Sequence, residues 1–128
     1  MTSRIEQEQP MTHPNLKSIP VSHGTHNGIP WAIMKNPELG FRCGYVQLPE
    51  AHPWRAGDTD ILDHIDAHGG ITYGPDKHGW IGFDTGHYCD YWPGTYFAQF
   101  GPEPHSIVWT AERMEQETIH LAELAAEE

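Results

Sequence analysis

Only one stretch of this chain has the residue spacing of a long helix, and it lies near the C-terminal end. Thr110 is suited to cap the first turn, and Glu112 places a negative charge in that turn, where it stabilises a helix. Apolar or small residues then recur along one face. The residues of that face are Ala111, Met114, Thr118, Leu121 and Ala125. The segment predicts an amphipathic helix lying on a sheet, with its glutamates on a solvated face.

Short apolar runs separated by turn residues precede this helix. Two of them, at residues 31–34 and 41–48, flank an Asn-Pro-Glu-Leu-Gly turn and predict an antiparallel pair. Two more, at residues 70–73 and 80–83, flank a Gly/Pro/Asp segment typical of a hairpin loop. The pattern predicts an α+β fold, in which a mainly antiparallel sheet of four to five strands is packed by the C-terminal amphipathic helix.

The segments between these elements predict one short helix and one long loop. The helix is expected from a cap at Asp58 or Thr59 to about Ile65. Residues 85–104 contain too many glycines and prolines for a helix, so they predict a long Gly/Pro/aromatic loop with a short strand at 96–100. Long ordered loops in small domains frequently carry function.

The length of 128 residues and an apolar content of 38% predict one domain rather than two. Residues 1–28 have neither helical nor strand period and are expected to form an extended or mobile N-terminal arm, which leaves residues 29–128 as a single α+β domain. The chain contains neither an apolar run of about 20 residues nor the apolar core of a secretory signal. These features predict a cytoplasmic protein that does not enter a membrane and whose two cysteines are free thiols.

The charge balance argues against a nucleic-acid partner. The chain carries a formal net charge of -11, and its seven Lys and Arg residues are not clustered as a phosphate-binding face requires. An acidic surface that imitates DNA is a further alternative, which the aromatic and histidine-rich composition of the central phrases disfavours.

Two glycine-rich phrases concentrate the side chains that carry chemistry. Residues 68–73 read His-Gly-Gly-Ile-Thr-Tyr, and residues 82–90 read Gly-Phe-Asp-Thr-Gly-His-Tyr-Cys-Asp. Imidazole and carboxylate are ligands that suit zinc, manganese or iron, and a bound metal lowers the pKa of its water toward 7. The sequence leaves the cofactor unknown; one hypothesis is a divalent metal such as zinc, with His52, His68, His87 and Asp90 as candidate ligands. Asp84 and His87 are the predicted catalytic residues, with Asp84 as general base.

Other interpretations of the same residues stay open. The acids and imidazoles can instead fix an irregular turn through backbone hydrogen bonds, since no metal spacing such as HExxH is present. A second hypothesis is a binding module without chemistry that holds a small-molecule ligand in an aromatic pocket. Its predicted residues are Trp54, Tyr73, Trp80, Tyr91 and Trp92. A third is an inhibitor of a host protein that uses the acidic helix or the aromatic loop, with a homodimer as one arrangement. Serine-hydrolase, P-loop and dinucleotide-binding motifs are missing.

Several phrases, in their order and spacing, resemble a family of small uncharacterised proteins of tailed bacteriophages and prophages. They are Cys43-Gly44-Tyr45-Val46, residues 49–53 with His52, residues 68–73, residues 80–84, His87 with Asp90, and Glu117-Thr118 in the final helix. The resemblance implies a phage origin and a setting in the host cell cytosol, and it implies no reaction. Thr85 stands where such relatives often carry cysteine, which weakens a proposal that a thiol is a ligand.

Overall fold

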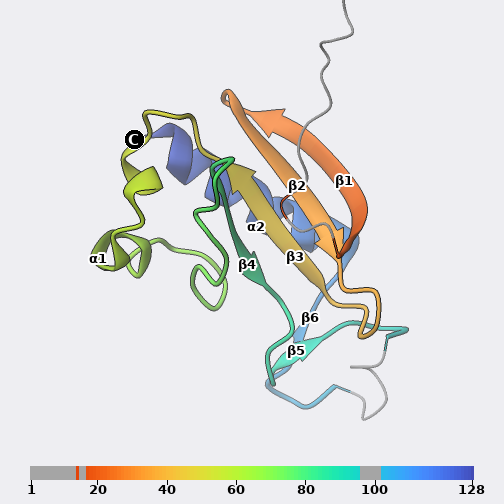
Figure 1. Ribbon diagram of the computed structural model, residues 1–128. Coiled ribbons are helices and arrows are strands. Elements are labelled where there is room, and N and C mark those ends of the chain that lie inside the picture. The colour runs from red at the N-terminus through yellow and green to blue at the C-terminus, as the bar shows by residue number, and fades with distance from the viewer. Residues whose placement is uncertain (1–13, 15–16, 96–101) are drawn as a thin grey trace, which may run out of the picture.

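The computed structural model describes residues 14, 17–95 and 102–128 and has an α+β fold (Figure 1). Its elements in chain order are β1 (Ile19–His26), β2 (Ile29–Lys35), β3 (Arg42–Gln47), the 3-10 helix η2 (Pro53–Ala56), α1 (Thr59–Leu62), β4 (Trp80–Asp84), β5 (Asp90–Tyr91), β6 (Ile107–Val108) and α2 (Ala111–Ala126). Strands β1 to β4 form an antiparallel sheet in that order, and β5 pairs with β6 in a separate parallel pair. The predicted fold class is therefore confirmed.

The turn between β2 and β3 follows from its sequence. Asn36 accepts the backbone N–H groups of Glu38 at 2.9 Å and Leu39 at 2.7 Å through its side-chain oxygen. Gly40 then takes a φ of +88°, a conformation that favours glycine. This turn sets the predicted antiparallel pairing, in which Trp31 lies opposite Val46.

Residues 19–26, which were expected in the N-terminal arm, instead form the edge strand β1. The sequence of this strand does not show the usual alternation of buried apolar and exposed polar residues. Its exposed side holds Ile19 and Val21, whereas its inner side holds small or polar residues such as Gly24. A Cβ on Gly24 would lie 2.7 Å from the Trp31 ring, so this strand packs through its backbone. The Asn27-Gly28 turn, with φ values of 51° and 83°, closes the β1–β2 hairpin; Asn-Gly is a hairpin signal that the prediction of an arm did not take into account.

Two other segments are shorter than predicted. The predicted strand at residues 70–73 forms only an isolated bridge between Tyr73 and Gly82, because positive φ angles at Gly69 and Gly70 prevent an extended run. The helix α1 begins after the predicted cap Asp58, whose side chain accepts the Asp60 N–H at 2.9 Å, but it ends at Leu62.

The described part of the predicted long loop contains one strand. Within residues 85–104, Asp90 and Tyr91 form β5, which pairs with β6 just before α2. The predicted strand at residues 96–100 lies outside the described residues.

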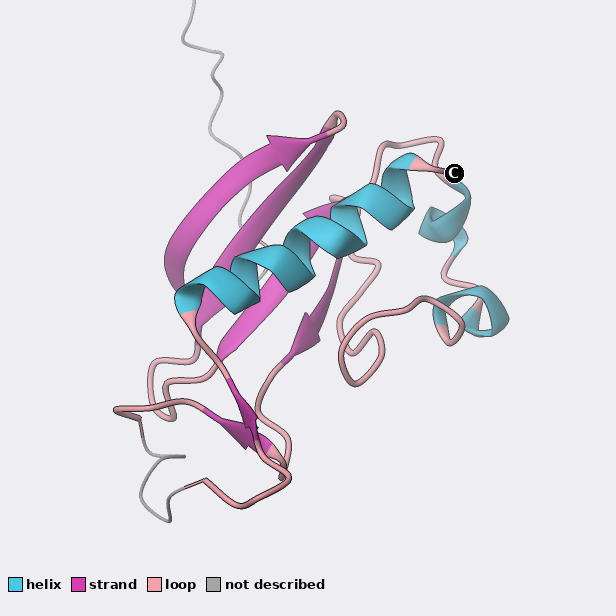
Figure 2. Ribbon diagram, turned by 180° about the vertical axis from the view of Figure 1, so that it is seen from behind, coloured by secondary structure: helices cyan, strands magenta, loops and turns pink. Residues whose placement is uncertain are grey.

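Helix α2 runs diagonally across one face of the sheet (Figure 2). Thr110 caps it as predicted, by accepting the Arg113 N–H at 3.0 Å. Of the predicted stripe, only Ala111 is exposed. The helix approaches β3 closely at Gly44, where a Cβ would lie 2.3 Å from Thr118 Oγ1. The buried helix residues are Met114, Thr118, Leu121, Ala122 and Ala125.

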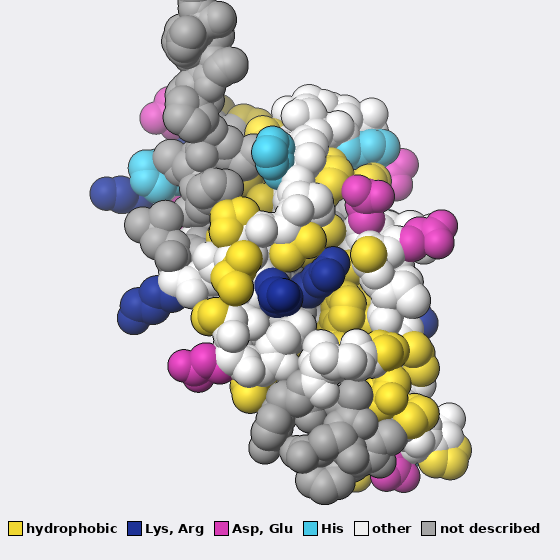
Figure 3. Space-filling model, turned by 90° about the vertical axis from the view of Figure 1, so that its right-hand side faces the viewer, with side chains coloured by type: hydrophobic (Ala, Val, Ile, Leu, Met, Phe, Trp, Pro, Cys, Tyr) yellow, Lys and Arg dark blue, Asp and Glu magenta, His cyan; other side chains and the backbone are white. Residues whose placement is uncertain are grey.

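The surface charge is unevenly distributed. On the face drawn in Figure 3, some Lys and Arg side chains lie near the middle among hydrophobic and neutral groups, others lie at the edges, and the acidic side chains are spread around the outer part of this face. In the described part of the chain, no helix combines the length and the apolar character needed to span a bilayer.

Candidate metal centre

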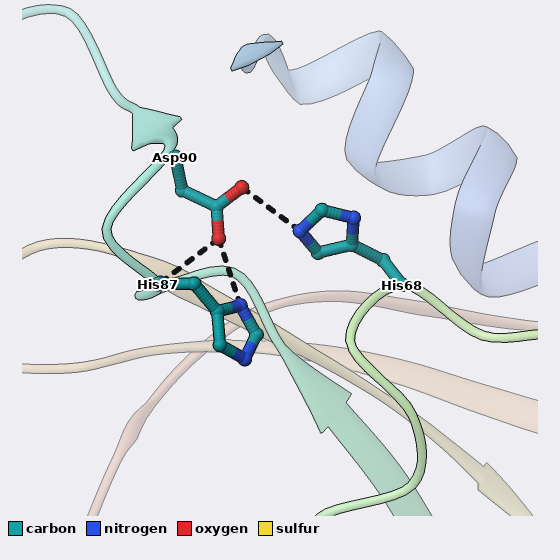
Figure 4. Close-up of side chains that lie close together, drawn as sticks. All are labelled: His68, His87 and Asp90. Carbon is teal, nitrogen blue, oxygen red and sulfur yellow. Dashed lines mark hydrogen bonds and ion pairs between the residues drawn. The ribbon is translucent and has the colours of Figure 1, made fainter. Parts of the chain in front are cut away.

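His68, His87 and Asp90 converge beyond the end of the sheet (Figure 4). His68 comes from the loop between α1 and β4, His87 from the loop after β4, and Asp90 begins β5. Each residue offers one potential ligand atom, and these atoms lie within 4.8 Å of one another. The structure thus brings together three of the four side chains that were predicted as metal ligands.

Asp90 lies at the centre of the cluster, and its side chain is only 1% exposed. Its Oδ1 accepts His68 Nε2–H at 2.8 Å and the indole N–H of Trp109 at 2.8 Å. Its Oδ2 accepts the backbone N–H and Nδ1–H of His87, both at 2.9 Å. Burial raises the pKa of this carboxyl, but the hydrogen bonds from Trp109 and His87 and the nearby His68 together hold it below its ordinary value of 3.8. Asp90 is therefore an ionised acceptor at neutral pH.

The geometry assigns the protons on the two imidazoles. An ionised carboxylate only accepts hydrogen bonds, so the nitrogens facing Asp90, His68 Nε2 and His87 Nδ1, carry protons in the structure. The outer ring nitrogens point away from each other (Figure 4). A single ion bound by both rings would therefore have to contact the nitrogens that face Asp90, His68 Nε2 and His87 Nδ1. A neutral ring would bind it after moving its proton to the outer nitrogen.

Asp84 lies at the outer edge of the His87 ring. Its Oδ1 is 3.5 Å from His87 Nε2 and also accepts the Gly86 N–H at 3.0 Å. Its Oδ2 accepts the Thr72 hydroxyl at 3.1 Å. Asp84 is thus placed to accept the outer N–H of a metal-bound His87, which is how carboxylates commonly orient histidine ligands. This position favours an orienting role over the predicted role of general base.

Gly69 allows the two imidazoles to approach. Its φ of +71° favours glycine, and a Cβ there would lie 2.5 Å from His87 Cε1. The His68 and His87 rings are 5.5 Å apart in an edge-to-face arrangement. Their side chains are 20% and 40% exposed, so solvent reaches the cluster although Asp90 is buried.

His52 is not part of the cluster, and its prediction as a metal ligand is corrected. Its Nε2–H donates to the Ala125 carbonyl at 2.8 Å, and its Nδ1 accepts the Trp54 N–H at 3.1 Å. Both nitrogens are thus used by the backbone, and the residue is 9% exposed. His52 ties η2 to the last turn of α2, a structural role.

The predicted aromatic pocket does not form. Trp80 is fully buried against Ala32 and Met34 on the sheet face opposite α2, whereas Trp54 and Trp92 are buried in the core beneath the helix. The Tyr73 hydroxyl hydrogen-bonds to Pro14 O and Asp76, and Tyr91 is half-buried. The three tryptophan rings are part of the core, Tyr73 packs against it, and Tyr91 is in neither core cluster. The residues that this corrects are Trp54, Tyr73, Trp80, Tyr91 and Trp92.

Trp109 is a residue of the site that the sequence analysis missed. It is 1% exposed, stacks on Trp92 at a centroid distance of 5.9 Å, and meets the His68 ring edge-to-face at 5.0 Å. An apolar residue directly before the cap Thr110 is a known signal for burial at a helix start. That signal predicts packing, but it does not identify Asp90 as the partner of the indole.

Comparison with protein-family models, with curated proteins and with solved structures found no match to this chain. The resemblance to phage and prophage proteins stays a prediction. A function is therefore inferred from the chemistry of the cluster. Two imidazoles and one carboxylate make a three-ligand set, which in catalytic zinc sites leaves the fourth position to water or substrate.

Proposed function

We propose that His68, His87 and Asp90 bind one divalent metal ion, with zinc as the expected ion, and that the site hydrolyses or lyses a small polar substrate. One observation carries the proposal. The loops that carry His68 and His87 and the first residue of β5, Asp90, bring their potential ligand atoms within 4.8 Å of one another, although His68 and Asp90 are 22 positions apart in the chain. Ordinary surface acids and imidazoles are not held in this way.

Two spacings in the cluster, from each imidazole to an oxygen of Asp90, are near those of a zinc site, and all the potential ligand atoms lie within 4.8 Å of one another. Zinc bonds to nitrogen and oxygen of about 2.0–2.1 Å place tetrahedral ligand atoms about 3.3 Å apart. His68 Nε2 lies 2.8 Å from Asp90 Oδ1 and His87 Nδ1 lies 2.9 Å from Oδ2. With the imidazole protons moved to the outer nitrogens, these spacings would have to open by roughly 0.5 Å to hold a zinc ion. Rotations of two partly exposed imidazoles supply such a change. Asp90 keeps its hydrogen bonds from the Trp109 indole and the His87 backbone N–H throughout.

In this proposal the two aspartates have different roles. Asp90 is a ligand and fixes both imidazoles, and Asp84 orients His87 from its outer side. A divalent metal held by His68, His87 and Asp90 would lower the pKa of a bound water toward 7 and would thereby supply a hydroxide nucleophile at neutral pH. The exposed edges of His68 and His87 leave access for a substrate.

Metal binding is tested by equilibrium dialysis of EDTA-treated protein against zinc, followed by elemental analysis. We expect one zinc per chain for the wild type, and loss of stoichiometric binding in His68→Ala and in His87→Ala. His120→Ala is the matched control, because His120 lies on α2, is not one of the clustered residues, and has its ring nitrogen 3.4 Å from Asp66. Folded wild-type protein that binds no zinc, or equal binding by all variants, would overturn the proposal.

Hydrolysis is tested with p-nitrophenyl acetate and bis(p-nitrophenyl) phosphate as probe esters. We expect zinc-loaded wild type to release p-nitrophenol faster than free zinc at the same concentration, and His87→Ala to fall to the rate of free zinc. Bound zinc without any such rate would keep the metal site and remove the hydrolytic part of the proposal.

A further inference from the structure

A hollow of about 350 Å³ lies beside the turn that joins β2 to β3. Lys35 and Arg42 contribute to it from the strand ends, Asn36 and Glu38 from the turn, and Trp92 from the segment after β5. The candidate metal ligands are not among its lining residues. This hollow is a separate feature of the molecule.

Lys35 and Arg42 face each other directly across the antiparallel strands β2 and β3. Like charges in this arrangement repel and destabilise a sheet. Among the described residues, neither side chain forms an ion pair with a carboxylate, and Glu38 forms none with either, although it lines the same hollow. The two half-buried cations therefore lie next to each other without an ion pair to a carboxylate among the described residues.

The surroundings of this pair favour an anion. The Arg42 guanidinium lies over the Trp92 ring at 5.3 Å, a contact that limits its movement. Asn36 uses its side-chain oxygen for two backbone N–H groups of the turn, which leaves its amide N–H₂ for a ligand. An ammonium, a guanidinium and an amide are together a set of donors suited to a tetrahedral oxyanion.

We propose that this hollow binds a phosphate-type oxyanion between Lys35 and Arg42, either free phosphate or the phosphate group of a small molecule. The anion removes the repulsion between the two cations and accepts hydrogen bonds from both. The volume of about 350 Å³ leaves room for atoms beyond the phosphate group itself. The proposal does not depend on metal binding, and the experiment is done in EDTA so that either proposal can fail alone.

Thermal unfolding is measured with inorganic phosphate and, in parallel, with glycerol 3-phosphate, each against chloride at matched ionic strength. We expect a saturable rise in Tm for the wild type, of about 4 °C at ten times the Kd. Lys35→Gln should equal or exceed the wild-type Tm in chloride, since the repulsion is gone, and should lose at least about 10-fold in phosphate affinity. Lys77→Gln is the control, because it removes an exposed lysine remote from the hollow and should behave as wild type.

A second variant separates binding from folding. Arg42→Lys keeps both charges but loses the planar group over Trp92, so it should retain a phosphate response at weaker affinity. Tighter binding of glycerol 3-phosphate than of inorganic phosphate supports a small organic phosphate as the ligand, and equal binding supports free phosphate. A wild-type Tm that phosphate does not change, or a phosphate response that Lys35→Gln retains in full, would overturn the proposal.

Discussion

Trp109 donates its indole N–H to Asp90 Oδ1 at 2.8 Å and so joins the segment before α2 to the candidate metal centre. The same ring stacks on Trp92 in the core and is covered by the Arg113 guanidinium at 5.3 Å. The central carboxylate is therefore held by a residue that also anchors the helix. Changes at the site are expected to affect both metal binding and folding, and the experiments need to separate the two.

Asp90→Asn is expected to lower the free energy of unfolding by about 2–4 kcal/mol at neutral pH, because a buried, ionised acceptor of four hydrogen bonds is lost. The folded pKa of Asp90 lies below its ordinary value of 3.8. Its ionised form therefore stabilises the protein above pH 3.8, and this contribution is lost as the pH falls through the lower folded pKa. Urea unfolding from pH 7 to pH 3 should show the wild type and the variant converging in acid. A difference that does not change with pH would contradict this assignment.

Gly69→Ala and Gly70→Ala form a matched pair at the site. Both glycines have positive φ, 71° and 84°, so alanine strains the backbone in each. Only at Gly69 does the added Cβ meet His87, at 2.5 Å, whereas nothing lies within 4 Å at Gly70. We expect Gly69→Ala to weaken zinc binding at least about 10-fold and Gly70→Ala to change stability alone. Calorimetric titration with zinc measures the difference, and equal affinities would show that the His87 position does not matter.

Asp84→Ala tests the orienting role of this carboxylate. Removing a carboxylate that orients a histidine ligand typically costs 10–100-fold in metal affinity, and we expect a loss of about that size. Asp66→Ala is the control, because it removes an acid whose side chain is 90% exposed and which pairs only weakly with His120. Zinc titration at fixed pH and ionic strength checks the prediction. A loss of the same size in both variants would indicate a general effect of net charge instead.

Cys43 is expected to be a poorly reactive thiol. Burial, and then the charge of Asp84, raise its pKa from 9.0 to about 11. At pH 8 its thiolate population should be on the order of 100-fold below that of an ordinary cysteine. The labelling rate with a disulfide reagent, measured in Cys89→Ser so that Cys43 is the single thiol, should be lower by about that factor. Labelling as fast as that of free cysteine would contradict the burial of this side chain.

The sequence predicted the fold class because its signals were local. The period of α2, its cap Thr110 and the turn at Asn36 each act within a few residues. Strand β1 was missed because its inner side is small or polar, and Gly24 is explained only by the Trp31 ring on the next strand. Packing between strands overrode the composition that suggested an arm.

The candidate site was predicted in part for a similar reason. His87 and Asp90 lie three positions apart, and the short loop between them lets the His87 ring hydrogen-bond directly to the Asp90 carboxylate. His68 joins them only through the tertiary fold, and its residue type and its glycine neighbours were the sole local signals. His52 carried the same signal, yet its ring binds the Ala125 carbonyl. Residue type alone cannot separate a ligand from a histidine that caps a helix.

X-ray absorption at the zinc edge of the loaded wild-type protein tests the central claim most directly. We predict a first shell of four nitrogen or oxygen atoms at about 2.0–2.1 Å, with the outer-shell scattering of two imidazoles and no sulfur at about 2.3 Å. His68→Ala is expected to retain no stoichiometric zinc, so a sample of this variant prepared in the same way, after dialysis, should not show this shell. A shell that contains sulfur, or one with a number of imidazoles that His68→Ala leaves unchanged, would contradict a metal centre formed by His68, His87 and Asp90.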